Sequence, residues 1–373
     1  MDALMLPLNW QRVRLGDIGK PCMCKRVMKH QTTRYGEIPF YKIGTFGNTA
    51  DAFISKKLFL EYKTKYSFPK KGDILISASG TIGKAVIYDG KPAYFQDSNI
   101  VWIDNDETLV KNDFLFYAYS NVKWNTEHTT ILRLYNDNFR NTLIPLPPLN
   151  EQSAIANILS DLDRYLCALD ALILKKEGVK KALSFELLSQ RKRLKGFNQA
   201  WQRVRLGDIA NYLTSNLSVE QITQQGEIKV YDVNNFIGYT DTTFISDKPY
   251  ISIVKDGSVG RVRILPPKTN ILSTMGALIA NHRTTTEFLF YLLSNFDFKN
   301  FTSGSIIPHI YFKDYKEKTI FLPPLNEQSA IANILSGLDN EITSLKNKKR
   351  QFENIKKALN HDLMSAKIRV LEK

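Results

Sequence analysis

The segment Gly80-Thr-Ile-Gly-Lys84 combines glycines with a lysine, the residue types of a phosphate-binding loop. A nucleotide-binding loop of that kind also needs a glycine five positions before its second glycine and a serine or threonine after the lysine. Ala78 and Ala85 occupy those two positions in this chain. We therefore predict a tight turn that projects Lys84 toward phosphate, and a related turn that projects Arg261.

The acidic residues and histidines of the chain do not form the pattern of a catalytic or metal-binding site. Asp51 with Glu61-Tyr-Lys63 has the residue types of a nuclease metal site, but the second half of the chain lacks a counterpart. The five histidines are scattered, and no residue pair recurs in both halves at catalytic spacing. The sequence also lacks a glycine-rich cofactor loop and the Asn-Pro-Pro-aromatic motif of adenine methyltransferases. We predict no catalytic, cofactor-binding or metal-binding residues.

Basic and aromatic residues alternate in several short segments, which is typical of nucleic-acid contact. Basic side chains hold a protein on phosphate, and Arg, Asn, Gln and Lys on loops read base edges. Any one of these residues taken singly is equally well explained as a solvated surface charge, so the prediction rests on the set. The predicted DNA-contacting residues are Lys25, Arg26, Lys42, Thr45, Lys63, Lys84, Arg133, Tyr135, Lys229, Arg261 and Lys313.

An internal repeat organises the elements that must position these residues. The fifteen residues from Leu146 to Ser160 return unchanged from Leu322 to Ser336, an offset of 176. Trp10 to Ile18 returns as Trp201 to Ile209, an offset of 191. Such identities do not arise by chance in 373 residues, and the period is much longer than that of a solenoid. The chain is therefore predicted to contain two copies of one unit.

The two copies differ between Phe53 and Gly80, where the first holds about 14 extra residues. This extra segment is rich in lysine and is expected to be exposed. Elsewhere in the first copy, apolar runs separated by Gly, Pro, Asn and Asp predict strands, among them Ile38-Pro-Phe-Tyr and Asp73-Ile-Leu-Ile-Ser. A helix is predicted at 111–121, and the fold class is expected to be α/β.

A long helix is predicted after each Pro-Pro-Leu-Asn-Glu-Gln segment, because apolar residues recur at alternating steps of four and three. Each ten-position seam is apolar at eight positions, and Val179 and Ile355 could replace a lysine after a small slip. Lys176 and Lys349, inside the seams, either set the register between the helices or extend to solvent. The predicted seam and docking residues are Glu151, Gln152, Ile155, Leu159, Leu162, Leu166, Glu327, Gln328, Ile331, Leu335, Leu338 and Ile342.

At the start of each helix an acidic residue favours the helix N-terminus and the asparagine is expected to cap it. This structural explanation for Glu151, Gln152, Glu327 and Gln328 stands beside the alternative that they contact a partner protein. The apolar stripe of a helix of some 45 residues, about 65 Å long, needs a partner, and the second copy is the nearest one.

Composition limits the classes of function. Fifty-one Lys and Arg against 37 Asp and Glu give a net charge of +14, which implies a polyanionic partner. Nucleic acid is the leading candidate and an anionic membrane the second. No apolar run approaches the roughly 20 residues of a membrane span, and the first residues do not resemble a secretory signal. Three cysteines cannot form a disulfide framework, so we expect reduced cysteines and a cytoplasmic protein.

The repeated Leu-Pro-Pro-Leu-Asn-Glu-Gln and Trp-Gln-Arg-Val-Arg-Leu-Gly-Asp-Ile segments, with Lys71-Gly-Asp-Ile-Leu-Ile-Ser, resemble the DNA-specificity subunit of type I restriction-modification systems. The resemblance covers essentially the full chain. It implies two target-recognition domains, at residues 1–148 and 196–322, and two long antiparallel helices forming a coiled coil, at residues 149–195 and 323–373. The second half departs from the first because it lacks the basic segment.

The resemblance also implies a non-catalytic subunit that binds double-stranded DNA, two methylation subunits and restriction or translocase subunits. S-adenosylmethionine, Mg²⁺ and ATP are expected on those partners and not on this chain. Each globular domain would read one half of an interrupted, non-palindromic site. Two alternatives remain open at this point: an enzyme with its own nuclease or methyltransferase activity, and a coiled-coil scaffold without a nucleic-acid role.

Overall fold

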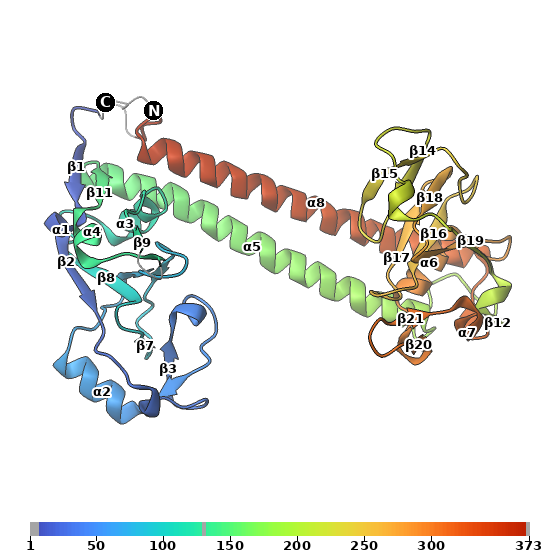
Figure 1. Ribbon diagram of the computed structural model, residues 1–373, viewed down its shortest axis with the longest axis horizontal. Coiled ribbons are helices and arrows are strands. Elements are labelled where there is room, and N and C mark those ends of the chain that lie inside the picture. The colour runs from blue at the N-terminus through green and yellow to red at the C-terminus, as the bar shows by residue number, and fades with distance from the viewer. Residues whose placement is uncertain (1–6, 129–131, 371–373) are drawn as a thin grey trace. The chain divides into compact units, whose positions relative to one another are not determined.

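The structure, a computed structural model, describes residues 7–128 and 132–370. Strands and helices are interspersed along the chain, so the α/β class expected from the sequence is confirmed. The chain divides into two compact units, whose elements are labelled in Figure 1. Unit 1 comprises Met1–Leu169 together with Lys348–Lys373, and unit 2 comprises Asp170–Asn347.

Unit 1 begins with strands and short helices. Its strands are β1 (Gln11–Arg14), β2 (Gly19–Met23), β3 (Ile38–Tyr41), β4 (Phe53–Ile54), β5 (Ile74–Ser77), β6 (Ala85–Ile87), β7 (Tyr94–Phe95), β8 (Ile100–Asn105), β9 (Glu127–His128), β10 (Leu132–Arg133) and β11 (Leu143–Leu146). Its shorter helices are α1 (Leu15–Ile18), η1 (Lys29–Gln31), η2 (Ile43–Thr45), α2 (Lys56–Lys65), α3 (Asn112–Tyr119) and α4 (Asn136–Asn141). The strands predicted in β3 and β5 and the helix predicted in α3 are thus confirmed.

The strands of unit 1 form an antiparallel four-stranded sheet in the order β2-β8-β5-β6, with Cys22 opposite Trp102. A three-stranded sheet has the order β4-β3-β7, in which β3 and β7 are parallel. β1 pairs with β11, and β9 pairs with β10. Phe114 of α3 lies in the same apolar core as Ile76 of the main sheet. The main sheet and α3 therefore share one core.

Unit 2 repeats this plan. Its strands are β12 (Gln202–Arg205), β13 (Ala210–Thr214), β14 (Ile228–Tyr231), β15 (Phe236–Thr240), β16 (Tyr250–Val254), β17 (Val262–Leu265), β18 (Thr269–Ile271), β19 (Met275–Ala280), β20 (Thr302–Ser303), β21 (His309–Ile310) and β22 (Thr319–Leu322). Its shorter helices are η3 (Leu206–Asp208), η4 (Val219–Gln221), α6 (Thr286–Ser294), η5 (Lys299–Phe301) and α7 (Phe312–Tyr315).

The sheet orders of unit 2 are β13-β19-β16-β17 and β15-β14-β18, which match those of unit 1 position by position. β12 pairs with β22, and β20 with β21. The two globular parts are therefore built on the same fold, as the repeat predicts.

The extra residues of unit 1 form helix α2. The Oγ of Ser55 accepts a hydrogen bond from the Leu58 N–H at 3.2 Å, which caps the helix. Phe59 is buried in an aromatic core and meets Phe68 edge to face at 5.6 Å. Lysines on the other faces of α2 are exposed, as predicted.

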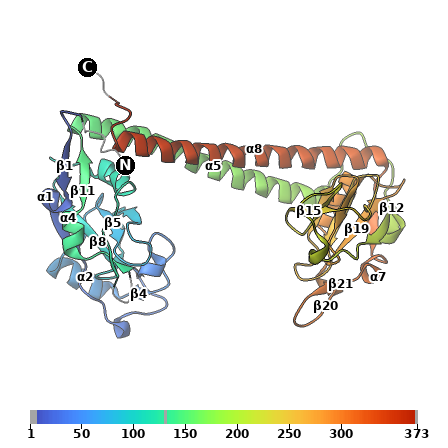
Figure 2. The same ribbon diagram turned by 45° about the horizontal axis from the view of Figure 1, so that its top comes forward.

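Two helices of 40 residues each, α5 (Leu149–Leu188) and α8 (Leu325–Met364), run from one unit into the other. Each is about five residues shorter than the pattern predicts, and a residue with positive φ follows its last turn, Gln190 at +61° and Ala366 at +55°. Within unit 1 the start of α5 lies beside the end of α8 (Figure 2). The ring centres of Tyr165 and Phe352 lie 4.8 Å apart between these two helices.

In both units the residue numbers of the two contacting helices run in opposite directions, so the packed segments are antiparallel. Every predicted seam position is buried or partly buried. Ile155 and Leu159 join the core of unit 1, and Ile331 and Leu335 join that of unit 2.

Two details of the predicted seam are corrected. Val179 and Ile355 are 45% and 50% exposed, so they do not replace the seam lysines. The lysines instead keep their seam positions through ion pairs: Lys176 Nζ lies 2.7 Å from Oε1 of Glu341 on the other helix. Lys349 pairs with Glu353 on its own helix at 3.5 Å.

Candidate nucleic-acid interface

A glycine turn follows an inner strand of the main sheet in each unit, β5 in unit 1 and β16 in unit 2. Gly80 and Gly83 have φ of +66° and +82° in unit 1, and Gly257 and Gly260 have +84° and +80° in unit 2. These values lie in the left-handed region, which residues with a Cβ rarely adopt. The tight turn predicted from the first segment is therefore present in both units.

Aromatic rings cover the second glycine of each turn. A Cβ at Gly83 would collide with the indole of Trp124, and one at Gly260 would collide with the ring of Phe298. Both turns therefore need glycine for two reasons, backbone conformation and close approach of a ring.

The lysine after the first turn is placed differently from the prediction. Lys84 is exposed, but its Nζ donates a hydrogen bond to the Phe46 carbonyl at 2.5 Å. Its ammonium is thus held by the protein backbone in this structure. Arg261, its counterpart in unit 2, is exposed.

The loop 96–99, between β7 and β8, brings several of the predicted residues of unit 1 together. Arg26 Nε donates to Oδ2 of Asp97 at 2.8 Å, and Arg133 Nη2 donates to Oδ1 of Asn99 at 3.1 Å. The Oγ of Ser79, beside the glycine turn, donates to the same Oδ1 at 2.8 Å. Loop 96–99 therefore joins the glycine turn to two arginines that are distant in sequence.

The turn formed by η2 holds two further predicted residues. The Thr45 Oγ1 accepts a hydrogen bond from the Lys42 N–H at 3.1 Å, and Lys42 Nζ forms an ion pair with Asp51 at 2.8 Å. The N–H of Ile43 donates to Oε1 of Gln96 at 3.0 Å, which attaches η2 to loop 96–99.

Other predicted residues lie apart from this loop. Lys63, on α2, places its Nζ 5.3 Å from the ring centre of Phe68, and Lys25 lies 5.1 Å from that of Tyr66. Lys229 is an exposed residue of β14 in unit 2. We keep these three as predictions of phosphate contact.

In unit 2 a histidine takes the place of Arg133. His309 Nδ1 lies 2.6 Å from Oδ1 of Asp256, the residue before the glycine turn. Tyr311 follows this hairpin as Tyr135 follows the hairpin of unit 1, and both rings are exposed. Lys313 Nζ lies 5.4 Å from the ring centre of Tyr311.

The acidic residue at the start of each long helix is buried. Glu151 accepts a hydrogen bond from Nε1 of Trp10 at 3.0 Å. It also accepts from Nε and Nη2 of the Arg369 guanidinium, at 2.7 and 3.0 Å. Glu327 is bound in the same way by Trp201 at 3.0 Å and by Arg193 at 3.1 and 2.6 Å.

The glutamines that follow are also buried and bonded within their units. Gln152 accepts from the Lys111 N–H and donates to the Pro147 carbonyl, both at 2.8 Å. Gln328 accepts from the Thr285 N–H at 3.0 Å and donates to the Pro323 carbonyl at 2.8 Å. These contacts favour the structural explanation for the four identical side chains.

The helix start itself differs from the expectation. α5 begins at Leu149 and α8 at Leu325. Asn150 and Asn326 therefore lie inside the first helical turn, and the expectation that they cap the helices is wrong. The N–H of Gln152 bonds to the Pro148 carbonyl, so the proline precedes the first turn.

A tyrosine, an aspartate and a lysine join each short helix to the long helices. The Tyr117 hydroxyl donates to Asp163 at 2.8 Å, and Asp163 also forms an ion pair with Lys356. Burial, followed by this hydrogen bond, raises the pKa of Tyr117. In unit 2 the same two contacts are made by Tyr291, Asp339 and Lys180, and the pKa of Tyr291 is raised for the same reasons.

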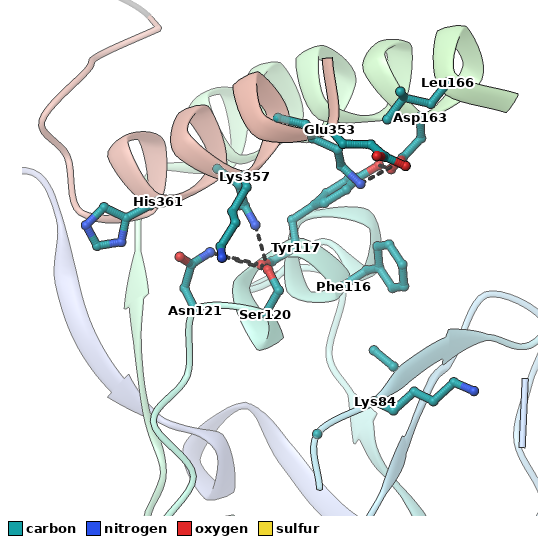
Figure 3. A pocket seen from close by; sticks show the side chains of 14 residues that line it. Lys84, Phe116, Tyr117, Ser120, Asn121, Asp163, Leu166, Glu353, Lys357 and His361 are labelled. Atoms are coloured by element: carbon teal, nitrogen blue, oxygen red, sulfur yellow. Dashed lines mark hydrogen bonds and ion pairs between the residues drawn. The ribbon is translucent and has the colours of Figure 1, made fainter. Parts of the chain in front are cut away.

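A groove of about 970 Å³ opens beside this contact in unit 1 (Figure 3). The figure shows residues of α3, α5 and α8 facing one another across it. The Asn360 amide donates to the Ser120 hydroxyl at 2.6 Å along one wall. The groove is lined by Lys84, Tyr117, Ser120, Asn121, Asp163, Leu166, Glu353, Lys356 and Lys357, among others.

Unit 2 has a corresponding groove of about 380 Å³. Most of its lining residues are repeat counterparts of those in unit 1. They are Glu177, Lys180, Lys181, Ser184, Tyr291, Ser294, Asn295, Asp339, Ile342 and Lys346.

The residues that could have bound a metal ion are engaged elsewhere. Asp51 pairs with Lys42, and Glu61 pairs with Lys65 at 3.0 Å. In residues 7–128 and 132–370 no three His, Cys, Asp or Glu side chains come together as a metal site would require. Within those residues, too, no helix is long and apolar enough to span a membrane.

Sequence reasoning missed the arginines that bind the buried acids. A signal existed, because Arg193 and Arg369 are related by the same offset of 176 as the identical helix starts. It also missed Asn99, Asp256 and His309. Their partners are distant in sequence, so no spacing pattern points to them.

The whole chain resembles known proteins of one family. A family model described as the type I restriction modification DNA specificity domain matches residues 7–176 and again residues 198–354. The MjaVIII specificity subunit of Methanocaldococcus jannaschii is 26% identical over 99% of this chain and 95% of its own length. A putative specificity subunit of Haemophilus influenzae, S.HindORF215P, is 61% identical, but the match spans 40% of each chain.

Two solved structures share the fold. The type I restriction-modification S subunit from M. genitalium has a TM-score of 0.63 at 20% identity, over 97% of both chains. A chain from a structure on complex assembly and conformational transition of the type I system has a TM-score of 0.58 at 16% identity, over 96% of this chain and 98% of that one. Since the family model covers most of the sequence in two copies, the chain belongs to the type I restriction-modification DNA specificity family, as a non-catalytic specificity subunit.

Proposed function

We propose that each unit binds one half of a bipartite double-stranded DNA site, and that the two half-sites differ in sequence. The observation that carries this proposal is the edge made by the glycine turn and the neighbouring hairpin. The two units share its backbone but differ in its polar side chains, Ser79 and Arg133 in one and Asp256 and His309 in the other. The net charge of +14 supplies the attraction to phosphate.

We further propose that the chain binds two copies of one methylation subunit. The buried acids and amides at the helix starts have partners within their units, so a docking surface must use exposed neighbours. Lys181 and Lys357 are exposed, identical in the repeat, and line the two grooves. Ile158 and Ile334 are 36% and 37% exposed on the identical helix segments. Like surfaces on the two units suit two copies of the same partner.

The chemistry of such a complex would reside on its other subunits. We expect S-adenosylmethionine on the methylation subunits, and Mg²⁺ and ATP on restriction or translocase subunits. We propose that the buried members of the predicted seam and docking residues stabilise the fold and do not contact a partner. We place the complex in the cytoplasm with the DNA that it reads. The domains proposed for DNA reading remain residues 1–148 and 196–322.

Co-expression with the methylation subunit tests the DNA-reading proposal. Exchange of residues 1–145 for the same region of another family member is expected to change one half of the methylated motif and to leave the other half intact. Genome-wide mapping of modified bases measures this. A change in both halves together would contradict separate reading by the two units.

Salt dependence tests the phosphate contacts. Six or more such contacts are expected to weaken binding about a thousandfold between 50 and 200 mM salt. Affinity of the full chain for duplex DNA, measured across this range, gives the slope. A flat response would remove the basis for a polyanion partner.

Charge reversal in the grooves tests the docking proposal. We expect Lys357→Glu or Lys181→Glu to remove one methylation subunit from the purified complex, and the double variant to remove both. Native mass spectrometry counts the copies. Lys175→Glu, an exposed helix position outside both grooves, is the control. Retention of two copies in the double variant would place the docking surface elsewhere.

A further inference from the structure

The edge made by the glycine turn and the hairpin has the same backbone hydrogen bonds in both units. The Leu134 N–H donates to the Ala78 carbonyl at 2.8 Å, and the Ile310 N–H donates to the Lys255 carbonyl at 2.9 Å. An isolated bridge then joins the next residue of the turn segment to the hairpin, Ser79 with Arg133 and Asp256 with His309. The backbone therefore places these residues equivalently in the two units, whatever their side chains are.

A third position is set by the strand that follows. The Ala78 N–H donates to the Asn99 carbonyl at 2.8 Å, and the Lys255 N–H donates to the Thr274 carbonyl at 3.1 Å. Asn99 and Thr274 both precede the other inner strand of their sheets, β8 and β19. They are therefore equivalent positions of the shared frame.

The side chains at these three positions differ between the two units. Unit 1 has Ser79, Asn99 and Arg133, bound through the Asn99 oxygen, with a guanidinium that carries five N–H donors. Unit 2 has Asp256, Thr274 and His309, with a carboxylate that can only accept when ionised. The edge of unit 1 thus presents a guanidinium, whereas the edge of unit 2 presents a carboxylate beside an imidazole.

From this juxtaposition we infer that these three positions determine which base pairs each unit reads. The inference rests on the proposed DNA-reading function and assigns its specificity to named residues. Arginine pairs with the O6 and N7 acceptors of guanine, and an acidic side chain accepts from the cytosine amino group. Arg133 therefore reads a guanine in the first half-site, and Asp256 reads a cytosine in the second.

The surroundings of the edge suit entry into a major groove. A two-stranded β-ribbon fits that groove, and the β20–β21 hairpin is such a ribbon. Ile306, in the loop of this hairpin, is 93% exposed and is placed to meet an apolar group such as the thymine methyl. Exposed Tyr135 and Tyr311 follow the two hairpins within two residues. The corresponding loop of unit 1 lies outside the described residues.

Exchange of these side chains between units tests the inference in the complex with the methylation subunit. Ser79→Asp with Arg133→His is expected to change the first half of the methylated motif, and Asp256→Ser with His309→Arg the second half. On duplexes with single base changes, Arg133→Ala is expected to lose about 10- to 100-fold discrimination at one position, the range of one bidentate contact. Discrimination between bases at the other positions of the site should be unchanged.

Lys91→His is the control, because it also replaces a cation of unit 1 by histidine but lies in the loop before β7, away from the edge. It is expected to leave the motif intact. An unchanged motif in both double exchanges, with methylation retained, would overturn the inference alone. A wild-type chain that binds DNA without sequence preference would instead overturn the proposed function. Each exchange is also made as single substitutions, which remain readable if a double variant does not assemble.

Discussion

Units 1 and 2 share the buried polar contacts at the starts of the long helices and differ in the polar contacts of the edge beside the glycine turn. Trp10, Glu151 and Arg369 in unit 1 have the same bonds as Trp201, Glu327 and Arg193 in unit 2. The edge beside the glycine turn, by contrast, carries unlike side chains, and α2 has no counterpart in unit 2. The fully buried carboxylates must keep their partners or lose free energy, whereas Arg133 and His309 at the edge are only partly buried and can change with the target.

The long helices show the same division along their own length. Between residues 164 and 176, only Leu169 is identical to its counterpart 176 residues later. Identity returns at Glu177, Lys180 and Lys181 and continues to Arg193, where α5 and the chain after it pack on unit 2. Contact with a globular part therefore limits the helix sequence more than contact between the two helices.

The largest effect is expected from removal of a buried glutamate, which tests whether the shared polar contacts stabilise the two units equally. Glu327→Ala leaves Arg193 and Trp201 without their acceptor, and we expect a loss of about 3–5 kcal/mol in unfolding free energy, as for a broken buried ion pair. Glu151→Ala is expected to cost about the same in unit 1. Urea unfolding followed by hydrogen exchange of peptides from each unit measures both. Markedly unequal losses would show that the shared contacts are not energetically equivalent.

Glycine replacement tests the shared turn. Gly83→Ala and Gly260→Ala each place a Cβ against an aromatic ring at positive φ, so we expect losses of about 1–3 kcal/mol. Trp124→Ala combined with Gly83→Ala removes the collision but keeps the backbone strain. Adding Gly83→Ala to the Trp124→Ala variant should therefore cost less unfolding free energy than adding it to the wild type. Thermal unfolding of the four variants gives the comparison. Full tolerance of alanine at either glycine would contradict the required turn.

Hydroxyl removal tests the tyrosine contacts more finely. Tyr117→Phe and Tyr291→Phe each delete one hydrogen bond to an aspartate, worth about 1 kcal/mol. Because the folded protein raises the pKa of both phenols, it favours their neutral form, and stability should fall as the pH rises above about 10, the ordinary tyrosine value. The double Phe variant should lose less stability between pH 9 and 11 than the wild type. An identical pH slope would disprove this assignment.

The smallest effect is expected between the helices. Lys176→Ala removes a partly exposed ion pair with Glu341, for which we expect a loss of about 0.2–1 kcal/mol. Lys175→Ala, one position away and exposed, is the control. Chemical denaturation resolves the difference. A loss above that of the tyrosine variants would mean that the helix pair is held more by charge than by apolar packing.

Sequence alone predicted the repeat, the fold class and the seam, because each depends on local period or on letter identity. Ile155 and Leu159 are buried as their spacing requires. It did not predict that Glu151 is buried, since a glutamate in a first helical turn is usually explained by the helix dipole. Nor could it predict that Lys84 binds the Phe46 carbonyl, because this contact depends on how two loops meet.

The residues grouped near Asn99 mark the same limit at the candidate site. Arg26 and Arg133 were chosen from the sequence for their charge, and the structure attaches both to loop 96–99. That loop contains no basic residue, so a search for basic and aromatic segments passes over it. A search for basic and aromatic segments therefore finds Arg133 at the proposed reading edge but does not find Asn99.

The split composition of unit 1 has a consequence for synthesis on the ribosome. Unit 2 is continuous in sequence, whereas unit 1 needs Leu363 for its core and Arg369 for Glu151, and both are translated after unit 2. Domains generally fold as they emerge, from the N-terminus onward. Here the globular part that is made first must wait for the arginine that forms the ion pair with its buried carboxylate, so unit 2 can finish folding before unit 1.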